Sequence, residues 1–282
     1  MNALLIMNPG SRSGKGRKLW SFWESGLKKR GINFDSVITE NPGNAFDLAR
    51  NAINYDTVIA AGGDGTINEV LDGIIQSGRK NLRMGILYSG TSPDFCRFHG
   101  IPTSPEKAVE ALADGRSRMV DAAEITYRLT GGEKIVSHFG CSSNIGLGPQ
   151  VARVSNLIRK FTGDTIGTCL ALIRAVTIMK SLDLEVKIDG LPVSLSGVNN
   201  LSILKNPYIA SGLRLDLDLS VDDGRLALFV VKSKSRLSIF SLLPGFYSGK
   251  AAKREDLFCK MCSSINVTCN KKVEIELDGD TR

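Results

Sequence analysis

Residues 60–70, AAGGDGTINEV, place three glycines around one carboxylate, Asp64, between an apolar run and an expected helix. Glycine permits backbone angles and close approaches that other residues do not. The free N–H groups and the dipole of a helix N-terminus attract anions. This turn therefore predicts a phosphate site, approached by the backbone of Gly62, Gly63 and Gly65. Because Asp64 would repel a bare phosphate, we expect it to reach Mg²⁺, directly or through water.

Two further turns combine glycine with polar residues. NPGSRSGKGR (8–17) follows the first expected strand, and SGTSPDFCR (89–97) follows the fourth. The first turn is one residue short of the P-loop pattern GxxxxGK, and Gly16 stands where a P-loop has Ser or Thr. The dinucleotide fingerprint GxGxxG is absent as well. Each turn alone is a weak signal, but three of them at one edge of a sheet predict phosphate binding.

Strands and helices alternate along the first 125 residues. We expect strands at 2–8, 34–40, 56–62 and 83–89, and helices at 16–30, 43–54, 67–78 and 104–114. Strands separated by helices of this length predict βαβ units and a parallel sheet. In such open sheets ligands bind beyond the carboxyl ends of the strands, where the three glycine-containing turns lie.

From about residue 120 the pattern becomes rich in alternating strands. We expect strands at 119–129, 133–143, 182–190, 191–205, 213–220, 224–232 and 265–279. One helical pattern, residues 150–181, interrupts them, with breaks at Gly163 and Gly167. The chain thus predicts an α/β domain with a parallel sheet over 1–122 and a mainly antiparallel β-sandwich domain over 123–282, packed with a cleft between them.

The charge distribution favours anionic partners. The 282-residue chain has a formal net charge of +7, and residues 1–30 hold seven basic residues against Glu24, a local net of +6. Later basic clusters are Lys232/Lys234/Arg236 and Lys250/Lys253/Arg254. Nucleotide phosphates and acidic lipid head groups suit such a balance, although a solvated surface is the ordinary alternative. Aromatic residues are only 6% and RNA-binding signatures are absent, so we expect no nucleic acid partner.

No apolar run approaches the ~20 residues that span a bilayer. The start, MNALLIMNPG, favours a buried strand over a signal peptide, so we expect a cytoplasmic location. The six cysteines are scattered, and the CxxC pair Cys259 and Cys262 lacks a second pair of ligands at zinc-site spacing. Reduced thiols are the simpler interpretation.

GGDGTINEV, with NPGSRSGKG before it and GTSPDFCR after it, resembles the diacylglycerol kinase catalytic-domain family, and in particular its small bacterial lipid kinases. Sphingosine kinases are relatives, and NAD kinases are more distant kin that share GGDGT. The resemblance covers nearly the whole chain, including DDG and LDGD near its end. It implies an NAD kinase-like, three-layer first domain and transfer of the γ-phosphate of ATP, with Mg²⁺, to a lipid hydroxyl.

Diacylglycerol is the first substrate to expect from this resemblance. Because such a substrate lies in a bilayer, we expect an enzyme of lipid metabolism that is peripheral to the membrane and contacts anionic phospholipid. A homodimer is a further expectation.

The resemblance also implies a set of site residues. The nucleotide is expected to contact Asn8, Ser11, Arg12, Thr39, Gly63, Asp64, Gly65, Thr66, Ile67, Asn68, Glu69 and Thr91. A magnesium element resembles SVDDGR, with Asp223 as the acidic member and Ser220 and Arg225 offering backbone oxygens. The family's terminal Asp-Gly-Glu matches residues 278–280, so Asp280 is the expected general base toward the lipid hydroxyl, and Asp278 could substitute for it.

Several of these residues have ordinary alternatives. Thr66 can cap the helix or bond a phosphate, and Asn68 and Glu69 can hold the adenosine or cap. The apolar stretches 166–179 and 237–246 either wall an acyl cleft or belong to the core.

Charged groups outside the main motifs have open roles too. Arg12, Lys15 and Arg97 either neutralise triphosphate charge or are surface cations. His99 and His138 fit no motif, and we expect both to be structural.

Two positions depart from the family pattern. Pro93 replaces an Asn, which removes a side-chain amide and a backbone N–H from the third turn. Asp280 replaces a Glu, which withdraws the carboxylate by roughly 1.5 Å. A misplacement of about 1 Å can cost on the order of a hundredfold in rate. Two alternatives therefore stay open: an NAD kinase-like enzyme with a soluble substrate, and a nucleotide- or lipid-binding protein without turnover.

Overall fold

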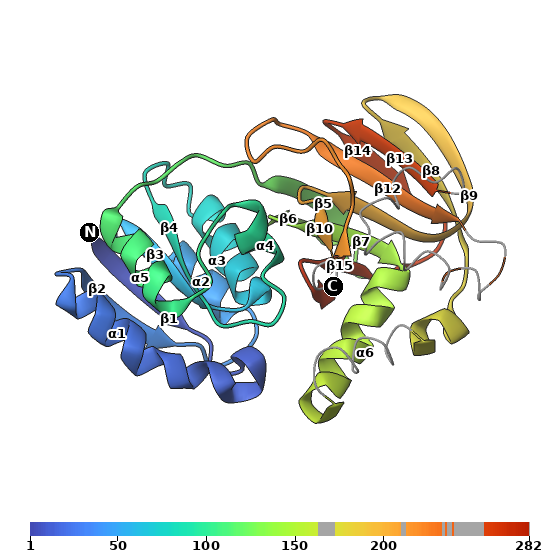
Figure 1. Ribbon diagram of the computed structural model, residues 1–282. Coiled ribbons are helices and arrows are strands. Elements are labelled where there is room, and N and C mark those ends of the chain that lie inside the picture. The colour runs from blue at the N-terminus through green and yellow to red at the C-terminus, as the bar shows by residue number, and fades with distance from the viewer. Residues whose placement is uncertain (163–172, 210–212, 233–234, 236–238, 240–256, 282) are drawn as a thin grey trace. The chain divides into compact units, whose positions relative to one another are not determined.

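The computed structural model of this chain describes residues 1–162, 173–209, 213–232, 235, 239 and 257–281 (Figure 1). It divides into two compact units. The first comprises Met1–Thr126 with Val136–Gly140, and the second comprises Tyr127–Ile135 with Cys141–Arg282.

The first unit is built on a four-stranded parallel sheet with the strand order β2-β1-β3-β4. The strands are β1 (Asn2–Met7), β2 (Asn33–Ile38), β3 (Thr57–Gly62) and β4 (Arg83–Tyr88). Every residue of β3 is buried, as expected for a central parallel strand that is covered on both faces. The expected parallel α/β fold is confirmed.

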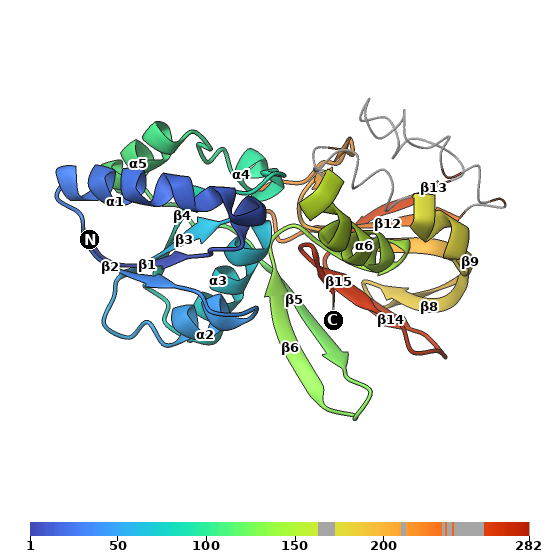
Figure 2. The ribbon, with the colours of Figure 1, turned by 90° about the horizontal axis from the view of Figure 1, so that it is seen from below.

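Helices cover both faces of this sheet and make three layers. α1 (Trp20–Lys29) and α5 (Pro105–Asp114) lie on one face, and α2 (Asn44–Arg50) and α3 (Asp64–Gln76) lie on the other (Figure 2). On the α1 side, Trp23 and Leu27 pack with Leu5 and Ile59 of the central strands, all of them fully buried. This apolar packing holds the strand ends in a fixed relation to one another.

Two helix starts differ from expectation. A 3-10 helix, Ser11–Leu19, precedes α1, because its Gly- and Ser-containing sequence has weak α-helix propensity. α3 begins at Asp64 rather than at residue 67, directly after the extended Gly63. The carboxylate therefore lies in the first helical turn.

The second unit contains an eight-stranded sheet whose strand pairings are antiparallel. Its strands are β7 (Ser142–Gly146), β8 (Leu182–Ile188), β9 (Leu191–Leu204), β12 (Leu226–Lys232), β13 (Leu257–Cys262), β14 (Ile265–Thr268), β15 (Ile275–Leu277) and β16 (Asp280–Thr281).

The long strand β9 organises this sheet. Its first half pairs with β8, and its second half lies between β12 and β7. Side chains of β8, such as Val186, thereby share a core with Leu228 and Val230 of β12. The expected antiparallel sandwich is confirmed.

Further elements of the described chain lie outside these two sheets. They are α4 (Asp94–Phe98), the paired strands β5 (Ala123–Arg128) and β6 (Lys134–Phe139), α6 (Leu147–Thr162), and the paired strands β10 (Tyr208–Ile209) and β11 (Leu213–Arg214). Residues 173–178 are also helical.

Several strand expectations were wrong in detail. The single strand expected at 133–143 is divided between β6 and β7, and the one expected at 265–279 is divided between β14 and β15. The strand expected at 213–220 is limited to β11, the strand expected from 119 begins at Ala123, and β13 was not expected. Of the residues singled out in the sequence, Gly163, Gly167, Lys234, Arg236, Lys250, Lys253, Arg254 and most of the stretch 237–246 lie outside the described residues.

Candidate functional site

Hydrogen bonds join the loops that follow β1, β3 and β4 at the carboxyl edge of the parallel sheet. The side-chain amide of Asn8 donates to Thr66 Oγ1 at 2.8 Å, which links the first loop to α3. The hydroxyl of Ser11 donates to the backbone oxygen of Ser89 at 2.9 Å and lies 2.8 Å from its hydroxyl, which links the first loop to the third. The three turns predicted from sequence thus form one connected edge.

Glycine is required where these loops approach each other. A Cβ atom on Gly62 would lie 2.5 Å from Thr66 Cβ, and one on Gly90 would lie 2.8 Å from Gly63 Cα. Either distance is closer than non-bonded carbons tolerate. Glycine at these positions therefore lets the Thr66 side chain pack against Gly62 and lets the loop after β4 approach Gly63. This close packing brings the loops together beside the N-terminus of α3, and a helix N-terminus attracts phosphate.

Asp64 lies half-buried at the start of α3 and is held by two neutral donors. Its Oδ2 accepts from the Tyr88 hydroxyl at 3.0 Å, and its Oδ1 accepts from the Phe95 N–H at 3.5 Å. Burial, followed by the charge of Asp64, raises the pKa of Tyr88, so the phenol stays a donor at neutral pH. The same two causes raise the pKa of Cys96 to about 12. Tyr88 and Phe95 thus fix the orientation of the Asp64 carboxylate, whose oxygens are of the kind that binds a hard cation.

The other predicted nucleotide contacts fall into different environments. Glu69 accepts from the N–H groups of Gly43 and Ala45 at 2.9 and 3.1 Å, so its carboxylate caps α2. Ile67 is a buried core residue and Asn68 is buried in the same turn of α3. Thr39 is buried at the end of β2, where its N–H donates to Met7 O at 2.9 Å.

Three further positions complete the predicted nucleotide set. Gly65 is half-buried in the first turn of α3, and Thr91 is half-buried in the loop after β4. The side chains of Arg12 and Lys15 lie outside the described residues.

The loop after β4 is organised by Pro93, Asp94 and Ser92. Pro93 precedes α4, and its backbone oxygen accepts from Arg97 N at 2.8 Å. The buried carboxylate of Asp94 accepts from Ser92 Oγ at 3.0 Å and lies 3.6 Å from the exposed Arg97 guanidinium. Pro93 therefore starts a helix in this loop, and Asp94 and Ser92 supply polar contacts there.

Tyr88 was not among the residues expected at this edge, whereas Ser89 and Gly90 begin the third predicted turn. Tyr88 could have been expected there, because it ends an apolar strand whose neighbours carry the glycine-containing turns.

Both histidines contact other side chains of the first unit, as expected for structural residues. His138 Nδ1 lies 2.8 Å from Asp72 Oδ1, and the His138 N–H donates to the same oxygen at 3.1 Å. His99 is buried against the rings of Phe95 and Phe98, with ring centroids 4.2 and 5.2 Å away.

In the second unit, Asp278 and Gly279 form the two-residue turn between β15 and β16. Both have positive φ, at 47° and 96°, as an Asp-Gly hairpin turn requires. The buried Asp278 carboxylate accepts from Cys141 N at 3.0 Å and from Ser142 N at 2.6 Å. Asp280 is paired with Leu277 through the backbone, and its side chain lies outside the described residues.

A second Asp-Gly turn in the same unit has the same construction. Asp189 and Gly190 join β8 to β9 with φ of 49° and 83°, and Asp189 accepts from Ser263 N and Ser264 N at 2.9 and 2.8 Å. Two successive N–H donors thus hold the aspartate of each turn. The likeness explains the contacts of Asp278 as structural, and a catalytic role for either Asp278 or Asp280 stays a prediction.

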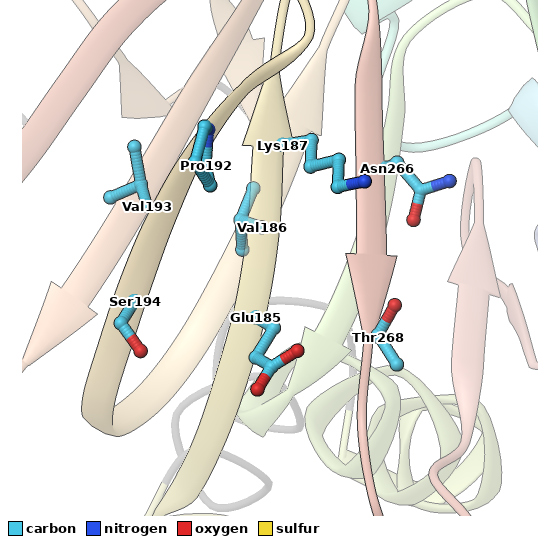
Figure 3. A pocket seen from close by; sticks show the side chains of 8 residues that line it. All are labelled: Glu185, Val186, Lys187, Pro192, Val193, Ser194, Asn266 and Thr268. Carbon is cyan, nitrogen blue, oxygen red and sulfur yellow. The ribbon is translucent and has the colours of Figure 1, made fainter.

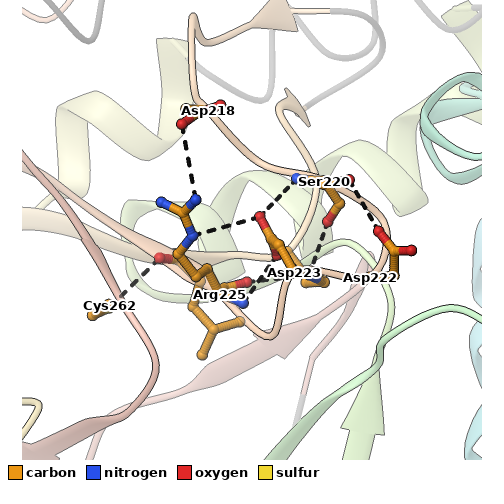
Figure 4. Close-up of polar contacts among 8 residues, drawn as sticks. Asp218, Ser220, Asp222, Asp223, Arg225 and Cys262 are labelled. Carbon is orange, nitrogen blue, oxygen red and sulfur yellow. Dashed lines mark hydrogen bonds and ion pairs between the residues drawn. The ribbon is translucent and has the colours of Figure 1, made fainter.

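The SVDDGR turn surrounds a cation that belongs to the chain itself. Asp223 accepts from Ser220 N and Arg225 N at 2.8 and 3.0 Å (Figure 4). The Lys205 ammonium donates to Asp223 Oδ1 at 2.8 Å, to Ser220 O at 3.0 Å and to Arg225 O at 3.3 Å. Oxygens of the three residues expected to hold Mg²⁺ therefore bind the Lys205 ammonium. This folded turn has no room for a metal ion in addition to the ammonium.

The protonation state of Asp223 follows from these contacts. Burial by itself would raise its pKa, but the Lys205 ammonium and the two backbone N–H groups lower it to about 2. Asp223 is thus ionised and paired at neutral pH.

A surface hollow of about 380 Å³ in the second unit is separate from all of these residues. It lies on β8, the start of β9 and β14, and residues such as Glu185, Lys187 and Ser194 line it (Figure 3). None of its lining residues belongs to the predicted site. Within the described part of the chain, no three His, Cys, Asp or Glu side chains gather as a metal cluster, and no helix has the length and hydropathy to cross a membrane.

Comparisons with known proteins agree with this architecture. The model of the diacylglycerol kinase catalytic domain matches residues 2–125, and that of the YegS C-terminal NAD kinase beta sandwich-like domain matches residues 142–282. The chain is 27% identical over 259 residues to diacylglycerol kinase of Staphylococcus aureus strain JH9, and to that of strain Newman, covering 90% of this chain and 78% of each relative.

Solved structures show the same fold. A diacylglycerol kinase structure from Bacillus anthracis strain Sterne matches with a TM-score of 0.74 at 22% identity, over 99% of this chain and 90% of that one. Yeast NADH kinase in complex with NADH matches with a TM-score of 0.50 at 12% identity, over 100% of this chain and 76% of that one. With both of its halves matched by family models, this chain belongs to the diacylglycerol kinase family of bacterial lipid kinases.

Proposed function

We propose that this lipid kinase transfers the γ-phosphate of ATP to the hydroxyl group of diacylglycerol, with Mg²⁺ bound beside the nucleotide. The observation that carries the proposal is the joined glycine edge of the first unit, where Tyr88 and Phe95 orient Asp64 at the N-terminus of α3. Bound Mg²⁺ would neutralise charge on the transferred phosphoryl group, which is the main demand of this chemistry.

The residues of this edge have separate tasks. Gly62 and Gly63 let the backbone approach the phosphates, and Asp64 binds the cation directly or through water. Asn8 and Ser11 fix the first loop against α3 and Ser89, so that the phosphate-binding surface is preorganised. Because Glu69 is engaged in capping α2, its task in this proposal is to fix the position of α3 relative to α2.

The test is transfer of label from γ-labelled ATP to diacylglycerol in mixed vesicles, with Mg²⁺ and with EDTA. We expect a labelled product that partitions into chloroform and disappears in EDTA. Asp64→Asn should reduce the rate by at least a hundredfold, because it removes the charge that holds the cation. The matched control is Asp47→Asn, which makes the same change at an exposed position in the first turn of α2.

Three results would contradict the proposal. A labelled product that stays in water when NAD is supplied would favour a soluble acceptor. ATP binding without any transfer would favour a binding protein without turnover. Full activity of Asp64→Asn would remove Asp64 from the site.

We also propose that Asp280 accepts the proton of the lipid hydroxyl, as its place in the terminal Asp-Gly-Asp suggests. General-base catalysis contributes about a hundredfold or more, so Asp280→Asn should lower kcat by at least that factor. Asp280→Glu restores the longer side chain of the family and should keep or raise kcat. Equal rates for the wild type and Asp280→Asn would contradict the role.

A lipid substrate requires contact with a bilayer, and we propose that α1 and the preceding 3-10 helix provide it. Their exposed basic side chains are Arg17, Lys18, Lys28, Lys29 and Arg30. Each charge near an anionic surface is worth about 1 kcal/mol. Lys18→Gln with Lys29→Gln should therefore weaken cosedimentation with phosphatidylserine vesicles roughly twentyfold. This proposal would be contradicted if vesicle binding changed neither with these substitutions nor with salt concentration.

A further inference from the structure

Lys205 is an unusual residue for the interior of this fold. It follows β9 directly, and only 2% of its side chain is exposed. Its backbone N–H donates to Cys141 O at 2.9 Å, which fixes the chain at the root of the side chain. Lysine is almost never fully buried unless it is paired, so the position of its ammonium requires an explanation.

The oxygens around Lys205 Nζ supply that explanation. The ammonium has three N–H donors, and Asp223 Oδ1, Ser220 O and Arg225 O lie 2.8, 3.0 and 3.3 Å away. One of these acceptors carries a full charge, and two are backbone carbonyls of a single turn. A carboxylate and backbone carbonyl oxygens are also the kind of ligands that bind Ca²⁺ or Mg²⁺ in other proteins.

A metal ion cannot share this position with the ammonium. Mg²⁺ requires oxygens at about 2.0–2.1 Å and Ca²⁺ at about 2.3–2.6 Å, so either ion would have to displace Nζ from its acceptors. Two cations side by side in a buried pocket would also repel strongly. The carboxylate is already neutralised by Lys205, and its remaining lone pairs accept the N–H groups of Ser220 and Arg225.

We propose that Lys205 is the built-in cation of the Ser220–Arg225 turn and takes the place that the family resemblance assigns to a metal ion. The turn is then ordered without a divalent cation, and removal of divalent metal does not change the stability of the second unit. An uncharged, shorter residue at position 205 would expose the same oxygens and convert the turn into a metal-dependent element.

The experiment compares thermal unfolding in millimolar MgCl₂ or CaCl₂ with unfolding in EDTA, without nucleotide and at matched ionic strength. Hydrogen exchange of the peptide that spans residues 218–227 gives a local measurement. We expect the wild-type Tm and the exchange rate of this peptide to be the same in metal and in EDTA.

Two variants sharpen the result. Lys205→Ala in EDTA should lower Tm by about 10 °C and speed exchange of the peptide, because Asp223 is left buried without its partner. Metal should restore most of this loss. Lys205→Met fills the same space without charge, so it should lose stability without rescue by metal. The exposed Lys187, changed to Ala, is the control and should leave Tm unchanged.

The proposal is overturned if metal protects the wild-type peptide 218–227 beyond the ionic-strength control, whereas a rise in Tm without this protection would report a metal ion bound elsewhere, such as at Asp64. It is also overturned if Lys205→Ala folds and metal does not restore it, because the turn would then not be a cation site. If Lys205→Ala does not fold, the wild-type comparison decides. These readouts need no kinase activity, so they are independent of the proposed function.

Discussion

Asp64 in the first unit and Asp223 in the second are both aspartates for which the sequence suggests a magnesium ligand, yet they accept hydrogen bonds from different kinds of donor. Asp64 accepts from a phenol at 3.0 Å and from a backbone N–H at 3.5 Å. Asp223 accepts from the Lys205 ammonium at 2.8 Å. A phenol and a backbone N–H orient a carboxylate, whereas a buried ammonium also forms an ion pair with it.

The partner of an aspartate, more than the motif around it, decides what the aspartate does. Each residue lies beside glycine in a turn that resembles a family element. Asp64 lies at a connected edge with a helix start that attracts anions, and we propose it as a cation ligand. Asp223 is part of an ion pair that organises a turn. Substitutions that change one partner at a time test how each aspartate is used.

The largest effect should come from removing the charge of Asp223. Asp223→Asn leaves the buried Lys205 ammonium without its counter-ion, and breaking such a pair typically costs about 3–5 kcal/mol. We expect the free energy of unfolding, measured in urea, to fall by about this amount. The neighbouring exposed Asp222 provides the matched control, and Asp222→Asn should cost less than about 1 kcal/mol. Equal losses for the two variants would mean that the ion pair contributes nothing special.

A smaller change is expected in how the free energy of unfolding depends on pH under acidic conditions. The folded-state pKa of Asp223 is about 2, below its ordinary value of 3.8. A carboxyl whose pKa is depressed on folding stabilises the protein above its unfolded pKa and loses this contribution as pH falls toward the folded pKa. The difference in unfolding free energy between the wild type and Asp223→Asn should therefore narrow from about pH 5 to about pH 2. If this difference stayed constant from pH 5 to pH 2, the pKa of Asp223 would not be lowered by folding.

The smallest effect should come from loosening Asp64 without removing its charge. Tyr88→Phe deletes the hydroxyl that donates to Asp64 Oδ2, a hydrogen bond worth about 1 kcal/mol. We expect kcat to fall about fivefold to tenfold and the Mg²⁺ concentration for half-maximal activity to rise, with KM for the lipid unchanged. Tyr55 also donates to an aspartate, Asp35, at 2.8 Å on an exposed surface, so Tyr55→Phe is the control and should alter neither value. A loss of stability with an unchanged Mg²⁺ dependence would make Tyr88 a structural residue only.

The first unit was largely predictable because its signals are local. Apolar runs such as TVIAAG and the glycine turns after them define each βα unit within a few residues of chain. The rule that ligands bind at the carboxyl ends of parallel strands then places the turns at one edge. The hydrogen bonds that join this edge, such as that between Asn8 and Thr66, span 58 residues and could not be inferred from spacing alone.

The second unit was predictable as a class but not in its pairings. Alternating residues identify strands, but β9 divides its length between different partners, which depends on contacts far along the chain. The segment LFCKMC drew attention as a CxxC motif, and the structure shows β13 there, with Cys262 buried in the sandwich core. Burial, the first cause, and the charge of Asp189, the second, raise the pKa of Cys262 to about 11, which leaves it a protonated thiol.

Local sequence patterns predicted most of the strands and helices of the first unit, the glycine-containing turns after β1, β3 and β4, and the family resemblance that these motifs carry. Only the tertiary structure decided that Glu69 caps α2, that Asp278 holds the backbone of Cys141 and Ser142, and that Lys205 neutralises Asp223. The physical reason is that a motif specifies local backbone geometry, whereas the charge and donors facing a side chain come from residues that folding brings together from 18 to 137 positions away.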